Sequence, residues 1–160
     1  MKSKNNIKVF TTVLALIVAL ALPALSEEKG ANNMQTLFSK ARADKKRFVE
    51  ENMKLTESEA KAFWPVYDSY QETLRILDDR LLKLIIRYAE VYDTISDKDA
   101  KVFREEYMAI TRERMRLLES CLQKLGKALP DKEVFRYFQI ERTWEAVIDT
   151  MLAKNISLVQ

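Results

Sequence analysis

One stripe of apolar side chains sets the strongest limit on how this 160-residue chain folds. From Ala60 onward, alternating steps of three and four residues meet an apolar or aromatic side chain every time. The positions are Ala60, Phe63, Tyr67, Tyr70, Leu74, Leu77, Leu81, Leu84, Tyr88, Val91 and Ile95. This spacing is typical of a helix that packs against other helices along its whole length. It predicts a helix over residues 56–95, about 60 Å long at 1.5 Å per residue.

Three further helices are predicted, over residues 33–52, 96–125 and 130–155. Each has an apolar face with helical spacing, and Gly126 is expected to end the third of the four helices in a left-handed conformation. Their apolar faces consist of Met34, Leu37, Phe38, Ala41 and Phe48, of Ala100, Phe103, Tyr107, Ile110, Leu117, Leu118, Cys121 and Leu125, and of Val134, Tyr137, Phe138, Trp144, Ile148, Met151 and Leu152. With only two Gly and three Pro, a turn-rich β fold is excluded, and the predicted fold class is all-α.

The length of the second helix predicts the overall shape. A spherical domain of roughly 134 residues would be about 36 Å across, which is shorter than this helix. We therefore expect an elongated, thin layer of about four helices in antiparallel hairpins. This layer would leave apolar residues outside the stripe exposed, namely Leu82, Ile85, Ile86, Ala89 and Tyr92. Exposed apolar surface marks an interface, here either with a second subunit, giving a homodimer, or with a client protein.

The N-terminal segment has the pattern of a secretory signal peptide. Lys2, Lys4 and Lys8 precede an uncharged apolar run over residues 9–22, and small residues follow up to Ser26. We expect cleavage after Ser26, with Ala24 as the second choice, which leaves residues 27–160 as a single helical domain. The run is shorter than the roughly 20 residues of a transmembrane helix, so a retained anchor is the weaker interpretation and no membrane span is expected after cleavage. The predicted location is the periplasm.

The charge balance of the exported part argues against nucleic acid as a partner. The whole chain has 27 basic and 24 acidic residues, a net charge of +3. Because three of the basic residues lie in the signal segment, the rest of the chain is neutral. Nucleic-acid binding usually requires a basic face that neutralises phosphates.

The sequence has no pattern of catalytic residues. There is no His, and no nucleophile elbow, phosphate-binding loop or zinc-type cysteine spacing is present. Asp78 and Asp79 are adjacent on a helix and are expected to be solvated. Glu141, Glu145 and Asp149 share a helix face, which we interpret as an acidic surface because carboxylate metal sites in bundles ordinarily add His. We therefore expect no enzyme activity, no metal and no cofactor.

Cys121 is the only cysteine, so no intrachain disulfide can form. It falls on the apolar stripe of its helix, which favours a buried and unreactive thiol. An intermolecular disulfide and a redox role are the alternatives, the second disfavoured because no Cys-x-x-Cys pair is present.

The second helix begins with a recognisable motif. In Leu55-Thr56-Glu57-Ser58-Glu59, Thr56 can cap the first backbone N–H groups while Glu59 reaches back to the cap, which is a capping box. Leu129-Pro130-Asp131-Lys132-Glu133 has a similar layout before the fourth helix. Pro65 predicts a kink or a broken turn close to the start of the second helix.

These features resemble the Spy/CpxP family of small periplasmic proteins, which combine a signal peptide, an all-helical chain and a Leu-Thr-x-x-Gln motif at helix starts. Here Glu59 stands in the place of the motif's Gln, and Pro130 replaces Thr at the second occurrence. The resemblance implies a curved, cradle-like antiparallel homodimer. It also implies either ATP-independent binding of unfolded or stressed envelope proteins, or a role as an accessory to an envelope stress sensor. Metal-responsive members have His-rich or Cys-rich segments, which this chain lacks.

The candidate binding residues combine apolar side chains with neighbouring arginines. They are Trp64, Leu82, Ile85, Ile86 and Tyr92, together with Arg87, Arg112, Arg114 and Arg116. Flexible Met108 and Met115 would help such a surface adapt to different segments. The alternative is that each of these side chains packs between helices.

Three hypotheses about function follow. The first is an ATP-independent periplasmic chaperone that holds exposed apolar segments of envelope proteins. The second is a signalling accessory that docks on one sensor domain. The third is a structural helical subunit of an envelope complex.

Overall fold

The structure, a computed structural model, describes the backbone of residues 27–156 and their side chains except those of 27–35, 37, 38, 151 and 155. Four helices are present: α2 (Glu27–Met53), α3 (Glu57–Val91), α4 (Asp97–Leu125) and α5 (Asp131–Asn155). The described residues contain no strand, so the predicted all-α class is confirmed. The predicted signal peptide and the side chains of Met34, Leu37, Phe38 and Met151 lie outside the described residues. Among the described helices, none is both long and apolar enough to cross a membrane.

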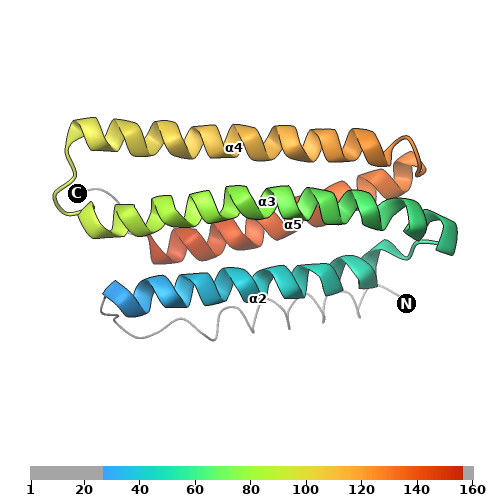
Figure 1. Cartoon of the computed structure of the whole chain (residues 1–160), viewed down its shortest axis with the longest axis horizontal. Coiled ribbons are helices and arrows are strands. Elements are labelled where there is room, and N and C mark those ends of the chain that lie inside the picture. Colours follow the sequence, from blue (N-terminus) through green and yellow to red (C-terminus); the bar gives the residue numbers. More distant parts are fainter. Residues whose placement is uncertain (1–26, 157–160) are drawn as a thin grey trace.

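The four helices lie along one long axis, and successive helices run in opposite directions (Figure 1). In this view α4 and α2 lie on opposite sides of α3, and α5 lies behind α3. The most extensive helix pair is α3 with α4, and α5 returns to contact both α2 and α4. The helices therefore enclose a common core. This differs from the expected thin layer, because α5 contacts both outer helices instead of extending the row.

The helix starts follow the predicted caps. Thr56 caps α3, and Ser96 caps α4 by accepting the backbone N–H of Asp99 at 3.1 Å. Pro130 is the residue immediately before α5, where its missing N–H costs nothing. Side-chain hydrogen bonds at Thr56 and Ser96 therefore set the beginning of α3 and α4 locally, whereas Pro130 makes no such bond at the start of α5.

Two predicted backbone features are corrected. Gly126 is right-handed, with φ of −63°, and after it the N–H groups of Lys127 and Ala128 bond three residues back, to the carbonyls of Lys124 and Leu125, in place of the four-residue helical bond. The left-handed residue is instead Lys54, with φ of 49°, in the link between α2 and α3. Of the two alternatives predicted at Pro65, a kink or a broken turn, the broken turn is absent, since α3 continues through this residue. Pro65 is exposed, so the Lys61 carbonyl that loses its donor is on the solvent side.

The core has two parts, which we call the aromatic cluster and the aliphatic cluster. The aromatic cluster is formed by Val49, Met53, Phe63, Tyr67, Tyr70, Leu74, Leu118, Cys121, Leu125, Leu129, Tyr137 and Ile140. The aliphatic cluster is formed by Ala41, Leu81, Leu82, Ile110, Trp144, Ile148 and Leu152. All four helices contribute to both clusters, with Trp144 as the one aromatic ring of the second. Six positions of the predicted stripe are buried: Phe63, Tyr67, Tyr70, Leu74, Leu77 and Leu81.

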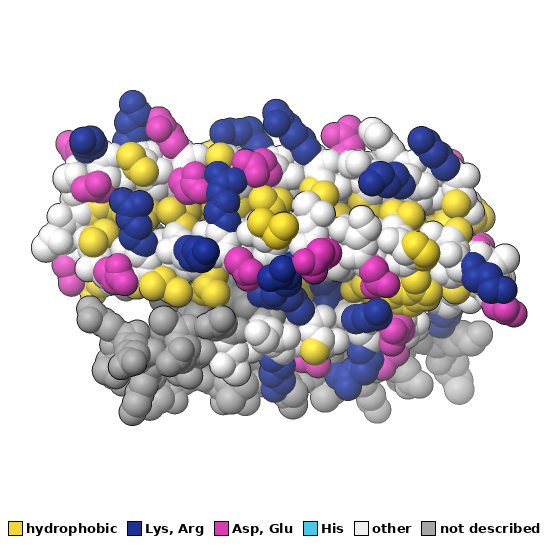
Figure 2. Space-filling model, viewed as in Figure 1, with side chains coloured by type: hydrophobic (Ala, Val, Ile, Leu, Met, Phe, Trp, Pro, Cys, Tyr) yellow, Lys and Arg dark blue, Asp and Glu magenta, His cyan; other side chains and the backbone are white. Residues whose placement is uncertain are grey.

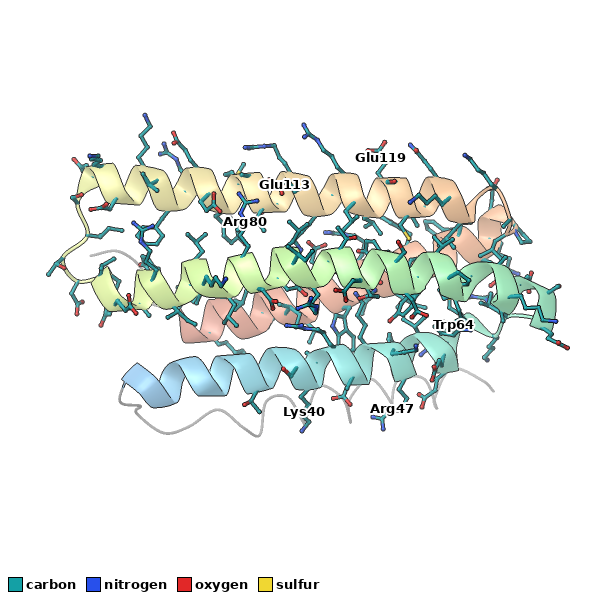
Figure 3. The ribbon with its side chains drawn as sticks, in the orientation of Figure 1. Lys40, Arg47, Trp64, Arg80, Glu113 and Glu119 are labelled. Carbon is teal, nitrogen blue, oxygen red and sulfur yellow. The ribbon has the colours of Figure 1, made fainter. Side chains whose placement is uncertain are left out.

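One arginine of α3, Arg80, forms ion pairs with two glutamates of α4 at the edge of the contact between these helices. Arg80 of α3 donates to both carboxylate oxygens of Glu106 at 2.5 and 3.0 Å, and to both oxygens of Glu113 at 2.9 and 3.0 Å. Figure 3 shows Arg80 and Glu113 facing each other between the two helices. The two glutamates are seven residues apart, so they share one face of α4.

Candidate functional site

The motif of Leu55, Thr56 and Glu59 forms the predicted capping box. The Thr56 hydroxyl accepts the Glu59 backbone N–H at 3.3 Å, and the Glu59 carboxylate accepts the Thr56 N–H at 2.8 Å. Hydrogen bonds from Thr56, first that of its backbone, lower the pKa of the Glu59 carboxyl. Leu55 packs half-buried against the aromatic cluster. The motif therefore serves to begin α3.

The predicted apolar residues in the second half of α3 are largely packed inside the chain. Leu82 is 7% exposed and belongs to the aliphatic cluster, and Ile85 and Ile86 pack against that cluster half-buried. The expected exposure of Leu82 is wrong because α5 supplies Trp144 and Ile148 to the same cluster. These three residues lie together, but not as an open patch.

Trp64 and Tyr92 lie close to opposite ends of α3. The Trp64 ring packs edge-on against Phe63 at 5.0 Å, and the Lys46 ammonium lies 5.5 Å from its centre. The ring of Tyr92 lies 6.3 Å from that of Tyr88. At 1.5 Å per residue the two positions are about 42 Å apart. The structure therefore does not join Trp64 and Tyr92 in one site.

The predicted arginines have different surroundings. Arg112 and Arg116 are exposed on α4, and the guanidinium of Arg87 lies 5.1 Å from the centre of the Phe103 ring. Arg114 instead pairs with Asp78 at 3.5 Å, with both side chains less than 20% exposed. The expected solvation of Asp78 is therefore wrong, and burial raises the pKa of its carboxyl while Arg114 opposes that shift.

The structure also exposes large apolar side chains that the sequence analysis did not identify as a group. Four of them lie on α4: Val102, Tyr107, Met108 and Met115, each between 42 and 49% exposed. Ile76 and Phe135 are also exposed, on α3 and α5. In the view of Figure 2, apolar side chains lie in bands between helices, with basic and acidic side chains beside them. Met108 and Met115 are seven residues apart, so the helical period could have identified them as one face.

A buried polar cluster joins α2, α3 and α5. Lys45 and Glu141 are 4 and 5% exposed, and the Lys45 ammonium donates to the Glu141 carboxylate at 2.8 Å. The Tyr70 hydroxyl and the Gln71 amide each donate to the same carboxylate at 3.2 Å. Glu141 is therefore not part of an acidic surface, whereas Asp149 is exposed and Glu145 is half-buried and pairs with Arg142. The sequence signal for this pair is Lys45 itself, which falls on the same four-residue spacing as Ala41, Val49 and Met53.

Burial suppresses ionisation around this cluster. The pKa values of Tyr67, Tyr70 and Tyr137 are all raised, mainly by burial and next by the charge of Glu141. The Tyr137 hydroxyl has no partner in hydrogen-bonding geometry. Cys121 is buried, and burial raises its pKa to about 12. The predicted buried thiol is therefore confirmed, and it is protonated at neutral pH.

The cavity beside the polar cluster is small. Its volume is about 50 Å³, and its charged lining includes Arg42, Lys45, Asp78, Arg114 and Glu141. That volume fits water molecules but not a cofactor or substrate, whose pockets measure roughly 300–1,000 Å³. Among the described residues, no three acidic or cysteine side chains are grouped so that they could hold a metal ion.

Comparisons of the chain with protein-family models, with curated proteins and with solved structures find no match.

Proposed function

We propose that this chain is an ATP-independent periplasmic holdase, a chaperone that binds exposed apolar segments of envelope proteins and keeps them from aggregating. The observation that carries the proposal is the surface of α4, where Val102, Tyr107, Met108 and Met115 are each between 42 and 49% exposed. Met108 and Met115 share one face of this helix, and grouped exposed apolar side chains are typical of a surface that contacts another chain.

The arrangement of residues on α4 fits loose recognition. Met108, Arg112 and Met115 follow the four- and three-residue spacing of one helix face, and all three are exposed. We call these three residues, together with Arg116 beside them, the α4 face. Methionine adapts its shape to different apolar partners, and the aliphatic part of an arginine side chain covers apolar surface while its charge stays solvated. Such a face suits unfolded segments in which apolar residues are mixed with acidic ones.

The buried polar cluster supports binding at the surface in preference to binding of a ligand beside that cluster. The cavity of about 50 Å³ is too small for a substrate, and the Glu141 carboxylate beside it is already bonded to Lys45, Tyr70 and Gln71. The resemblance to the Spy/CpxP family, export to the periplasm and a homodimeric state belong to the same proposal. Compared with the α3 residues considered from the sequence alone, the site now centres on α4 and retains Arg112 and Arg116.

The test is an aggregation assay with a chemically unfolded client protein and purified residues 27–160. Suppression of light scattering is expected at near-stoichiometric ratio without ATP. The double variant Met108→Gln/Met115→Gln should lose most of this protection, because it removes exposed apolar surface from α4. Ile76→Gln is the matched control, since Ile76 is 58% exposed and belongs to α3, not to the α4 face.

Two results would favour the alternative functions. No protection at several-fold excess, combined with saturable binding to one envelope sensor domain, would indicate a signalling accessory. A lone chain that is insoluble and that co-purifies with a stable envelope assembly would indicate a structural subunit. Equal protection by the wild type and by the double methionine variant would move the site away from α4.

A further inference from the structure

The surface that α2 covers on α3 and α5 is charge-complementary to α2. Three basic side chains of α2 meet carboxylates of the rest of the bundle: Lys45 meets Glu141 at 2.8 Å, Arg42 meets Asp79 at 3.1 Å, and Lys46 meets Asp68 at 3.3 Å. At the end of α2, the guanidinium of Arg136 donates to the Met53 carbonyl at 3.0 Å. We call this surface of α3 and α5 the α2 site. Its charges specify one position of α2 along the bundle.

The apolar part of this contact is narrow. The buried side chains of α2 among the described residues are Ala41, Lys45, Val49 and Met53, one in every four, and one of them is charged. By contrast α3 buries seven side chains, and all of them are apolar or aromatic. Because α2 is the first of the described helices, only one link, residues 54–56, joins it to the rest of the described bundle.

The link between α2 and α3 stores backbone strain. Only residues 54–56 separate the two helices, and they lie between buried Met53 and the capping box that begins α3. Lys54 has φ of 49°, the one positive value at a non-glycine residue in the described part of the chain. Left-handed backbone is costly for a residue with a side chain. A short strained hinge of this kind favours exchange of the adjoining element between two copies.

We infer that α2 exchanges between two copies of this chain, so that the α2 site of each copy binds the α2 helix of the other. The two swapped sites repeat every contact of the closed chain, and a two-fold axis closes the assembly. Opening the hinge releases the strain at Lys54 in both copies, while the capping box, which lies within α3, is unchanged. The α2 helix of a second copy has the same side chains as the chain's own α2 and can therefore form the same ion pairs with the site.

The inference is tested by reversing one charge of the Lys45–Glu141 pair in each of two separate chains, both consisting of residues 27–160. Lys45→Glu and Glu141→Lys each place like charges together in a closed chain and in a dimer of identical copies. A mixture of the two variants restores an opposite-charge pair at both sites, but only when α2 is exchanged. After joint refolding, we expect a particle of twice the chain mass that contains one copy of each variant, at more than ten times the dimer level of either variant alone.

The double variant Lys45→Glu/Glu141→Lys is the matched control, since it restores the pair within one chain. If it folds while the mixed single variants show no heterodimer, the inference is overturned. The result is distinct from the holdase assay, because the α4 face is untouched by these substitutions.

A second measurement avoids substitutions in the core. Lys46→Cys in one copy and Asp68→Cys in another place two exposed thiols at an α2–α3 ion pair. A short bis-maleimide should join them between chains if α2 is exchanged. Cross-linking only when both cysteines occupy one chain would contradict the exchange.

The hinge gives a graded test of the same inference. Lys54→Gly removes the strain from the closed chain, so the dissociation constant of the dimer should rise by about tenfold in light-scattering measurements across a dilution series. Lys54→Ala keeps a side chain at the left-handed position and should leave the constant unchanged. Equal dimerisation of the glycine and alanine variants would count against the hinge as its cause.

Discussion

The helices α2 and α4 both pack on α3, but their contacts are of different kinds. Toward α4, the contact is extensive and largely apolar, with Phe103, Ile110 and Leu118 buried. Arg80 lies at its more exposed edge, whereas the Asp78–Arg114 pair is more enclosed. Toward α2, a buried lysine lies in the contact: the Lys45 ammonium is 5.8 Å from the centre of the Tyr70 ring of α3 and pairs with Glu141 of α5. Apolar burial supplies stability in proportion to area, whereas a buried ion pair recovers only part of its desolvation cost and mainly fixes position. The α3–α4 pair is therefore the stable part of the molecule, and the place of α2 depends on a few specific partners.

The largest expected effect is in the aromatic cluster. Phe63 is fully buried, and its ring contacts those of Trp64, Tyr67 and Tyr137. Phe63→Ala should lower the free energy of unfolding in urea by about 3–5 kcal/mol, the usual cost of removing a buried phenyl ring. Ile76→Ala, on an exposed position of the same helix, should change it by less than about 0.5 kcal/mol. If Phe63→Ala lowered the free energy of unfolding less than Val49→Ala in α2, the conclusion that α2 contributes less stability than the rest of the bundle would be wrong.

The second expected effect is at the buried ion pair. Lys45→Met should cost about 3 kcal/mol, the lower end for a broken buried pair, because Tyr70 and Gln71 still donate to Glu141. Glu141→Leu should cost more, since it leaves the Lys45 ammonium buried without its acceptor. The double variant Lys45→Met/Glu141→Leu should come close to the wild type in urea unfolding, because apolar replacement of both partners removes the desolvation cost. Additive losses in the double variant would show that the two side chains do not act as a pair.

The difference between the α3–α4 pair and α2 also explains which features the sequence predicted correctly. Heptad spacing identified α3 and six of its buried positions, because an apolar stripe reports burial directly. Capping chemistry located the starts of α3 and α4 at Thr56 and Ser96, since those hydrogen bonds lie within four residues. Both signals are local in the chain, and both are strong in the α3–α4 pair.

The sequence failed where a partner lies far along the chain. Glu141 looked solvated because its buried partner Lys45 is 96 residues away. Leu82 looked exposed because its cover comes from Trp144 and Ile148 of α5. The expected thin layer failed for the same reason, since helix length alone does not say that α5 contacts α2. The exposed α4 residues were only partly anticipated, through Met108 and Met115, because exposure depends on what the other helices leave uncovered.

A smaller effect is expected at the helix caps. Thr56→Ala and Ser96→Ala each remove a side-chain acceptor for a backbone N–H, which should cost about 1 kcal/mol in urea unfolding. Because the two caps are separate, their losses should add in the double variant. Thr56→Ala should also leave the α2 contacts unaltered, which the chemical shifts of α2 amides would check. A loss at Thr56 several times that at Ser96 would mean that the cap also holds α2 in place.

The smallest expected effect is a pH dependence at the inner edge of the α3–α4 pair. Burial raises the pKa of Asp78 above its ordinary 3.8, and Arg114 offsets part of that shift. A raised pKa means that the folded chain holds this proton more tightly than the unfolded chain. Asp78 therefore favours folding most below pH 3.8, and this contribution is lost as the pH rises through the folded-state pKa. The stability of the wild type relative to Asp78→Asn should fall across that interval.

Glu59 should show the opposite pH dependence of stability in the same titration, because its pKa is lowered where that of Asp78 is raised. Hydrogen bonds from Thr56 lower the pKa of its carboxyl below 4.5, so its contribution is present above that pH and is lost as the pH falls. The free energy of unfolding of the wild type relative to Glu59→Gln should therefore rise with pH. The free energy of unfolding of the wild type relative to Asp78→Asn should fall with pH. Urea unfolding at a series of pH values measures both slopes. Two slopes of the same sign would mean that Arg114 holds Asp78 in its charged form, and the Asp78–Arg114 pair would then resemble the buried pair at Lys45 more than the apolar contact around it.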